Sequence, residues 1–160
     1  PPLPSQDPSK SNHPIDRFID SKLVQADLEP SPLADRRTLL RRLSFDLRGL
    51  PPTPEEVEAF VQDMSEDAYE RRVDAYLQSS AFAEKQAIAW LDAVRYADTT
   101  GFHGDQDVDV WPYRDYVLQS FLNNKSFDQF TREQLAGDLL ENPTSEQLTA
   151  TAFNRLNRMS

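Results

Sequence analysis

Apolar residues recur along most of the chain in short runs, which proline, glycine and polar residues separate. Within each run they lie three and four positions apart, the spacing of a helix with one buried face. No segment alternates apolar and polar residues as a half-buried strand does, and the chain shows no repeat of about 20–50 residues. The runs predict an all-α fold: a single compact domain over residues 14–160, with seven or eight short helices in an orthogonal bundle.

The clearest helix boundaries surround a proline-rich turn. Gly49 is placed to cap the end of the helix expected over residues 33–47, and the prolines after it block continuation. Thr53 and Glu56 have the spacing of a capping box, in which an N-cap hydroxyl is followed three residues later by Glu. We expect a new helix to begin there.

The widest apolar arc belongs to the helix expected over residues 81–97. At 100° per residue, its apolar side chains cover about half of the circumference, so several neighbours should pack against it. We expect this helix to form the centre of the domain. Its apolar positions are Phe82, Ala83, Ala87, Trp90, Leu91, Ala93, Val94 and Ala97.

Residues 1–13 contain four prolines and almost no apolar side chains. This composition predicts an extended linker with nothing to bury. A tether to an upstream domain is the favoured interpretation, and a proline-rich ligand for a partner domain is the alternative. We expect the whole segment to be part of a longer multidomain protein.

The composition excludes several kinds of site. The 160 residues include no cysteine and two histidines, His13 and His103. Without cysteine there is no thiol nucleophile, disulfide, thiolate metal site or CxxCH haem attachment, and two histidines cannot build a His-rich zinc or iron site. The four glycines fit no phosphate-cradling motif. We therefore expect no cofactor in this chain, and no apolar run approaches the ~18 residues that span a bilayer.

The chain is acidic, with a formal net charge of −10. Because this charge repels a polyanion, we expect no nucleic-acid partner. A basic cluster on the second expected helix stands out against this background. Its arginines pair with the chain's carboxylates, which is the favoured interpretation, or form a docking patch for an anion or a partner. The cluster consists of Arg36, Arg37, Arg41, Arg42 and Arg48.

A second charged group lies near the end of the central helix. Asp92, Arg95 and Asp98 follow one another at intervals of three, so on a helix the guanidinium would lie between the two carboxylates. Arg114 and Asp115 could join them across the next loop. We interpret the group as a structural ion network that anchors this loop; substrate positioning or acid–base chemistry is the alternative.

The loop over residues 98–110 is the longest irregular stretch between the expected helices. Asp105, Asp107 and Asp109 have the 1-3-5 spacing of an EF-hand, but valine at the sixth position and tyrosine at the twelfth exclude that motif. A looser Ca²⁺ site is the alternative to a solvated acidic loop. Because binding groups concentrate on loops held by rigid scaffolds, this loop is the best candidate site.

Aromatic residues follow this loop, beginning with Trp111. They could line a sugar-binding wall, although aromatic residues at a helix start more often serve the core. His103, as a lone histidine within the loop, could be one member of an acid–base pair.

Six motifs carry a resemblance that spans about residues 13–156. They are HPIDRFI (13–19), RRLSFDLRGLPPTP (41–54), WLDAVRYAD (90–98), YRDYV (113–117), FDQF (127–130) and EQLAGDLL (133–140). In sequence and order they resemble the planctomycete cytochrome-c-associated domain of unknown function. The family motifs share six residues with the expected site, namely Asp92, Arg95, Asp98, Gly101, Arg114 and Asp115.

The resemblance implies a module of a large exported bacterial protein, often with a c-type cytochrome module before it and an uncharacterised domain after it. It implies an extracytoplasmic location, with the export signal outside this segment, and a role tied to a redox or polymer-degrading system. Haem would belong to a neighbouring module, since this chain carries no haem motif. The resemblance supplies no catalytic residues.

We favour binding over catalysis by this domain alone. The leading hypothesis is a helical interaction module whose recognition surface lies around residues 92–115 and whose partners are neighbouring domains, a c-type cytochrome module or carbohydrate. The alternative is a polysaccharide hydrolase that uses Asp98 and Asp105 with His103 nearby. A third possibility is a spacer that positions a cytochrome against its electron donor.

Overall fold

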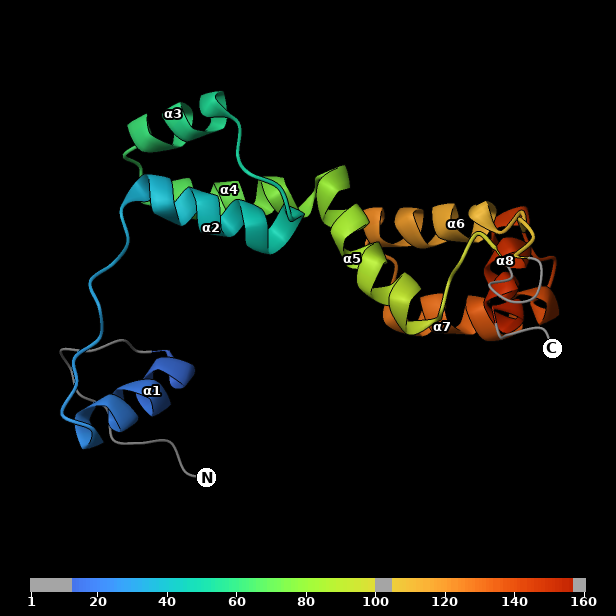
Figure 1. Cartoon of the computed structure of the whole chain (residues 1–160), viewed down its shortest axis with the longest axis horizontal. Helices are drawn as coiled ribbons and strands as arrows, with labels where there is room; N and C mark the ends of the chain where they lie inside the picture. Colours follow the sequence, from blue (N-terminus) through green and yellow to red (C-terminus); the bar gives the residue numbers. More distant parts are fainter. Residues whose placement is uncertain (1–12, 100–104, 157–160) are drawn as a thin grey trace. The chain divides into compact units, whose positions relative to one another are not determined.

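The computed structural model describes residues 13–99 and 105–156. These ranges contain eight α-helices, two 3₁₀ helices and no strand, which confirms the predicted all-α class (Figure 1). None of the described helices is both long and apolar enough to cross a bilayer. The helices are α1 (Pro14–Gln25), α2 (Arg36–Arg48), α3 (Pro54–Gln62), α4 (Ala68–Leu77), α5 (Ser80–Ala93), α6 (Trp111–Leu122), α7 (Phe127–Ala136), η1 (Gly137–Leu139), α8 (Ser145–Ala150) and η2 (Thr151–Arg155).

Contacts divide the chain into two units, residues 1–35 and 36–160. The first contains α1, whose N-cap is His13 and whose first residue is a proline. The His13 imidazole accepts a hydrogen bond from the Ile15 N–H at 3.3 Å. No residue of α1 is buried. The domain boundary at residue 14 stays a prediction.

In the second unit, α2, α3 and α4 surround a small core of Leu40, Leu43, Phe60, Ala68 and Tyr76. The sharp turn between α2 and α3 follows the predicted signals. Gly49 has φ +72°, and its N–H donates to the Phe45 carbonyl oxygen at 3.1 Å. The capping box is formed: the Glu56 N–H donates to Thr53 Oγ1 at 3.2 Å, and the Thr53 N–H donates to the Glu56 carboxylate at 2.8 Å. Both predicted boundaries are confirmed.

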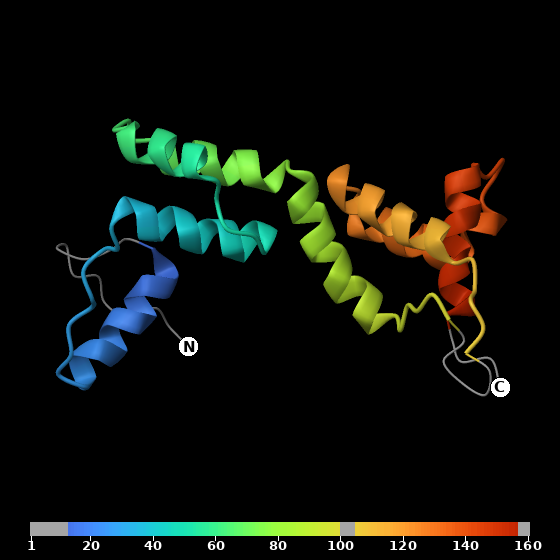
Figure 2. The same ribbon diagram turned by 45° about the horizontal axis from the view of Figure 1, so that its top comes forward.

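A second core joins α5, α6, α7 and α8, and its buried members are Ala87, Tyr113, Tyr116, Val117, Phe130 and Ala150. Helix α5 contacts α2, α4 and α6, which confirms its central place. Figure 2 shows it crossing the α6–α7 pair obliquely. The wide apolar arc on this helix is therefore explained by neighbours on several sides.

Helix α5 ends at Ala93, four residues before the predicted end. Arg95 adopts a left-handed conformation with φ 59°, and the Tyr96 N–H donates back to the Leu91 carbonyl oxygen at 2.9 Å. This is a Schellman termination with arginine where glycine is usual. A sequence pattern cannot reveal such an end, because no glycine marks it.

Three of the five arginines of the basic cluster on α2 form hydrogen bonds with residues of α3 or with its C-cap residue. Arg48 forms a bidentate pair with Glu56 at 2.9 and 3.1 Å, and Arg37 pairs with Glu58 at 2.8 Å. Arg36 instead donates to the carbonyl oxygens of Phe60 and Asp63 at the end of α3. The favoured interpretation, pairing with carboxylates, is confirmed for Arg37 and Arg48.

Candidate functional site

The loop after α5 is closed at its base. The Val108 N–H donates to the Asp98 carbonyl oxygen at 2.8 Å, and an isolated antiparallel bridge joins Thr99 to Asp107. The base therefore brings residues 98–99 against residues 107–108. Gly101 and His103 lie outside the described residues.

The ion network expected around Arg95 is not seen in the described part of the chain: Asp92, Arg95 and Asp98 are all exposed, and no ion pair joins the three. The physical reason is the early end of α5: the left-handed turn at Arg95 removes the helical register that would have placed its guanidinium between the carboxylates. The importance of these residues for binding stays a prediction.

Tyr96, rather than Arg95, is the residue that hydrogen-bonds to Asp98. Its hydroxyl donates to the Asp98 carboxylate at 2.5 Å. Burial of the ring, followed by this hydrogen bond and the charge of Asp98, raises the Tyr96 pKa to about 12, and the charges of Arg114 and Asp115 act on it as well. Arg114 and Asp115 pair with each other at 3.3 Å. The joining of Arg114 and Asp115 to Asp98 stays a prediction, and the tyrosine that bonds Asp98 was not singled out by the sequence analysis.

The aspartates of the loop do not form the cation site that their spacing allowed. Within residues 13–99 and 105–156, no group of three or more acidic or histidine side chains is arranged to hold a metal ion. Asp105, Asp107 and Asp109 are all exposed. The EF-hand spacing is therefore not accompanied by convergence of the side chains.

The aromatic residues at the start of α6 divide between surface and core. Trp111 is 53 % exposed, whereas Tyr113 and Tyr116 are buried. The Tyr113 ring stacks between Tyr96 and Tyr116, with centroid distances of 6.4 and 6.3 Å. Its hydroxyl donates to the Gln134 side-chain oxygen at 2.6 Å, which also accepts from the Trp90 indole at 3.1 Å. These contacts hold the Tyr113 side chain in place next to the loop.

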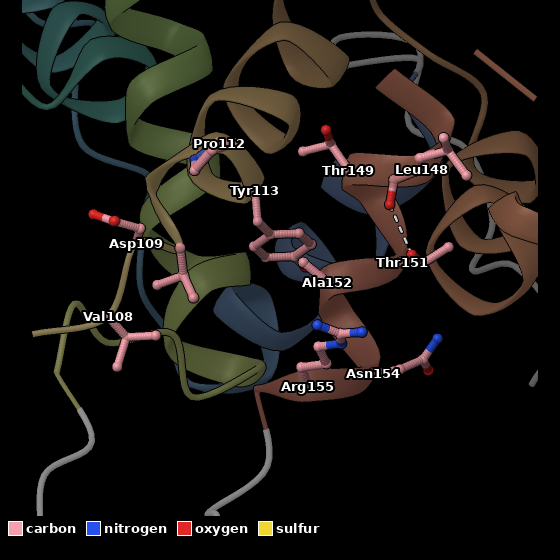
Figure 3. A pocket seen from close by; sticks show the side chains of 11 residues that line it. Val108, Asp109, Pro112, Tyr113, Leu148, Thr149, Thr151, Ala152, Asn154 and Arg155 are labelled. Carbon is pink, nitrogen blue, oxygen red and sulfur yellow. Dashed lines mark hydrogen bonds between the residues drawn. The ribbon is translucent and has the colours of Figure 1, made fainter. Parts of the chain in front are cut away.

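A pocket of about 770 Å³ lies between the end of this loop and the last helices (Figure 3). One wall comes from residues 108–113, inside the predicted recognition surface, and the other from α8 and η2. The volume is typical of a small-molecule or side-chain site, which ranges from about 300 to 1,000 Å³. Its lining residues are Val108, Asp109, Val110, Pro112, Tyr113, Leu148, Thr149, Thr151, Ala152, Asn154 and Arg155.

Most of the polar side chains that line this pocket already form hydrogen bonds within the fold. Thr149 and Thr151 donate to the carbonyl oxygens of Ser145 and Leu148, the second bond being drawn in Figure 3. The Asn154 amide donates to the Gln134 carbonyl oxygen at 3.2 Å. The remaining lining is chiefly apolar, with the Tyr113 ring beside Ala152 (Figure 3).

Two charged side chains in the lining have no partner in the described part of the chain. Asp109 is on the loop wall and Arg155 is on the opposite wall at the end of η2, and both are exposed. The pocket therefore offers an apolar interior together with one anionic and one cationic group. Such an arrangement can bind a ligand that has an apolar body and charged groups beside it.

The sequence analysis missed the second wall of the pocket. Helix α8 begins at a capping box between Thr144 and Gln147. The amphipathic pattern nevertheless gave no reason to connect Leu148 or Arg155 with a loop about forty residues earlier. Asp98 and Asp105, the candidates of the hydrolase alternative, do not line this pocket, and their catalytic role stays a prediction.

The comparisons with known proteins identify a family for this chain but no characterised relative. Residues 14–160 match the PSCyt2 family, described as a protein of unknown function (DUF1549). No match was found among the curated proteins or the solved structures. The match covers all eight described α-helices and the pocket. The chain therefore belongs to the PSCyt2 (DUF1549) family of unknown function.

Proposed function

We propose that this chain is a protein-interaction module and that the pocket between residues 108–113 and Leu148–Arg155 is its recognition site. The observation that supports the proposal most strongly is the composition of the pocket. Its hydroxyl and amide groups are hydrogen-bonded within the fold, while Asp109 and Arg155 are left to pair with a ligand.

The proposed occupant is a segment of a partner protein that inserts one apolar side chain into the pocket and carries charges on either side of it. The apolar lining supplies the affinity through burial, at about 25 cal/mol per Å² of apolar surface. Asp109 and Arg155 select the orientation, because a cationic residue beside the first and an anionic residue beside the second pair correctly in only one direction.

The proposal also concerns the domains expected beside this one. The name of the family, together with the resemblance of the motifs, supports a place beside a c-type cytochrome module in an exported protein. Haem would then lie in that neighbouring module. In this setting the pocket would dock a segment of a neighbouring domain and hold the two modules together.

Selection from a random peptide library displayed on phage, against the whole chain, tests the proposal. The selected peptides should share an apolar residue with a basic residue on one side and an acidic residue on the other, and calorimetry should give their affinities. Leu148→Asp and Arg155→Glu should each weaken binding by about tenfold or more, equivalent to about 1.4 kcal/mol. Both residues are exposed, so the variants should fold.

Two comparisons make this test decisive. Leu139→Asp changes an exposed apolar residue outside the pocket and should leave the affinity unchanged. Replacing the acidic residue of the peptide with lysine should restore binding to Arg155→Glu. The proposal is overturned if the selection gives no binders, or if the peptides bind Leu148→Asp as tightly as the unaltered chain.

A further inference from the structure

A second pocket, of about 300 Å³, lies among α5, α6 and α7 and shares no lining residue with the first. Its size is at the lower end of the range for small-molecule sites, about 300 Å³, which suits one ring rather than an extended chain. Its lining residues are Phe82, Gln86, Trp90, Ser120, Phe121, Asn124, Lys125, Phe127 and Phe130.

The apolar lining of this second pocket is entirely aromatic, with five rings and no aliphatic side chain. Three of the rings are packed in the core, since Trp90 and Phe121 both contact Phe130. Phe82 and Phe127 have no ring contact in the described part of the chain, and Phe127 is 72 % exposed. Phe127 therefore presents an exposed aromatic side chain at the pocket, beside the partly buried Phe82.

The pocket offers no unpaired charge. Lys125 is its single titratable lining residue, and its ammonium group donates to the Glu133 carboxylate at 2.6 Å and lies 4.5 Å from the centroid of the Tyr116 ring. Because the lining has no carboxylate and its one cation is paired within the fold, a charged ligand gains no ion pair here. A cation could contact only the aromatic faces, without a counter-ion, so the lining favours a neutral ligand.

Two amide side chains supply hydrogen-bonding capacity. Gln86 and Asn124 line the pocket, and their amide groups have no partner in the described ranges. Each amide can donate and accept. The Ser120 hydroxyl donates to the Tyr116 carbonyl oxygen at 2.8 Å, which leaves its oxygen able to accept a bond.

We propose that this aromatic and amide pocket binds a single neutral sugar ring, a pyranose. One face of a pyranose presents C–H groups that carry small positive charges, which suit the negative face of an aromatic ring. Its edge carries hydroxyl groups that donate and accept, as amides require. An aliphatic side chain from a partner protein would satisfy neither Gln86 nor Asn124, so the lining favours the sugar.

The proposal is tested by titrating the whole chain, labelled with ¹⁵N, with D-glucose, D-galactose, D-mannose, D-xylose, L-fucose and N-acetyl-D-glucosamine. At least one sugar should shift the side-chain amide resonances of Gln86 and Asn124, with saturation at millimolar concentration. Phe127→Ala should weaken this binding by about tenfold. Because Phe127 is exposed, the variant should fold as the unaltered chain does, and a thermal melt checks this.

Leu135→Ala is the matched control, because Leu135 is on the same helix, is 56 % exposed and does not line the pocket. It should bind the sugar as the unaltered chain does. The proposal is overturned if no sugar shifts the two amides, or if Phe127→Ala and the unaltered chain bind equally. It is also overturned if toluene or indole binds while every sugar fails, since the pocket then accepts an apolar group.

Discussion

The two cores of the second unit each contain an ion pair covered by a tyrosine ring, and the pairs are built differently. Beside the α2–α4 core, Arg48 pairs with Glu56 and its guanidinium lies 3.7 Å from the centroid of the Tyr76 ring. In the α5–α8 core, Lys125 pairs with Glu133 at 2.6 Å beneath Tyr116. The side chain of Glu133 is 4 % exposed, against 21 % for Glu56.

The deeper carboxylate is also the more completely hydrogen-bonded. Glu133 accepts from the Lys125 ammonium, the Tyr116 hydroxyl and the amides of Gln129 and Gln147. These donors come from α6, α7, α8 and the turn before α7, so one acidic group ties four segments together. In the α2–α4 core the Tyr76 hydroxyl is buried without a partner in the described ranges. The more deeply buried carboxylate therefore has donors from more segments, whereas Glu56 accepts hydrogen bonds from Arg48 and the Thr53 N–H.

Removing the carboxylate should produce the largest loss of stability, and the loss should differ between the two cores. Glu133→Ala leaves the nearly buried Lys125 ammonium, among the described residues, with only a long pair to Glu146, at 3.8 Å, and should lower the free energy of unfolding by about 3–5 kcal/mol. Glu56→Ala should cost less, about 1–3 kcal/mol, because Arg48 keeps the Tyr76 ring and a hydrogen bond to Ser44. Urea unfolding of the whole chain measures both values.

The exposed Glu141→Ala serves as the control for these two variants and should change stability by less than about 0.5 kcal/mol. Equal costs for Glu133→Ala and Glu56→Ala would contradict the distinction between the cores.

Glu133 and Glu56 should also differ in how strongly they make stability depend on pH. Burial opposes ionisation of Glu133, but its hydrogen bonds outweigh burial and lower the pKa to about 2 from 4.5. Since the folded pKa is depressed, the stabilisation is complete above about pH 4.5 and is lost as the pH falls toward 2, by about 3 kcal/mol in total.

Glu133→Gln should remove most of this acid dependence, whereas Glu56→Gln should remove less. The pKa of Glu56 is also lowered, since its bonds to Arg48 and Thr53 outweigh the effect of burial. Urea midpoints measured between pH 2 and pH 7 give the two slopes. An unchanged acid slope in Glu133→Gln would show that other carboxylates dominate.

The two regions also use glycine for different physical reasons. Gly49 has a left-handed φ, and an added Cβ would make only ordinary contact with the Lys85 side chain at 3.6 Å, so Gly49→Ala should cost about 1–2 kcal/mol through backbone strain. A Cβ at Gly137 would lie 2.2 Å from the Gln147 carbonyl oxygen, so Gly137→Ala should cost about 1–3 kcal/mol through overpacking against α8.

Asparagine distinguishes strain from crowding at these glycines. It adopts left-handed conformations more readily than alanine, so Gly49→Asn should recover stability relative to Gly49→Ala. Gly137→Asn should be no better than Gly137→Ala. Thermal unfolding of the four variants tests both expectations, and rescue at Gly137 rather than at Gly49 would reverse the assignment.

The local features of both regions could be predicted from sequence because their causes are local. The capping box at Thr53 and the cap at Gly49 depend on residues within one turn, and the helices follow from apolar spacing. The end of α5 could not be predicted, since Arg95 occupies a conformation that its residue type does not signal. The pocket depends on contact between segments about forty residues apart, and no local pattern encodes that contact.

The smallest effect, and the last test of the comparison, concerns the two tyrosine hydroxyls. The Tyr116 hydroxyl donates to the Glu133 carboxylate at 2.9 Å, so Tyr116→Phe should cost about 1.5 kcal/mol, the lower end for a bond to a charged group, because three donors remain. Tyr76→Phe removes a buried hydroxyl that has no partner in the described chain, so stability should stay within about 0.5 kcal/mol or rise. Urea unfolding at pH 7 compares them. If Tyr76→Phe proved as costly as Tyr116→Phe, its hydroxyl would have a partner in solution, and the α2–α4 core would be as fully hydrogen-bonded as the α5–α8 core.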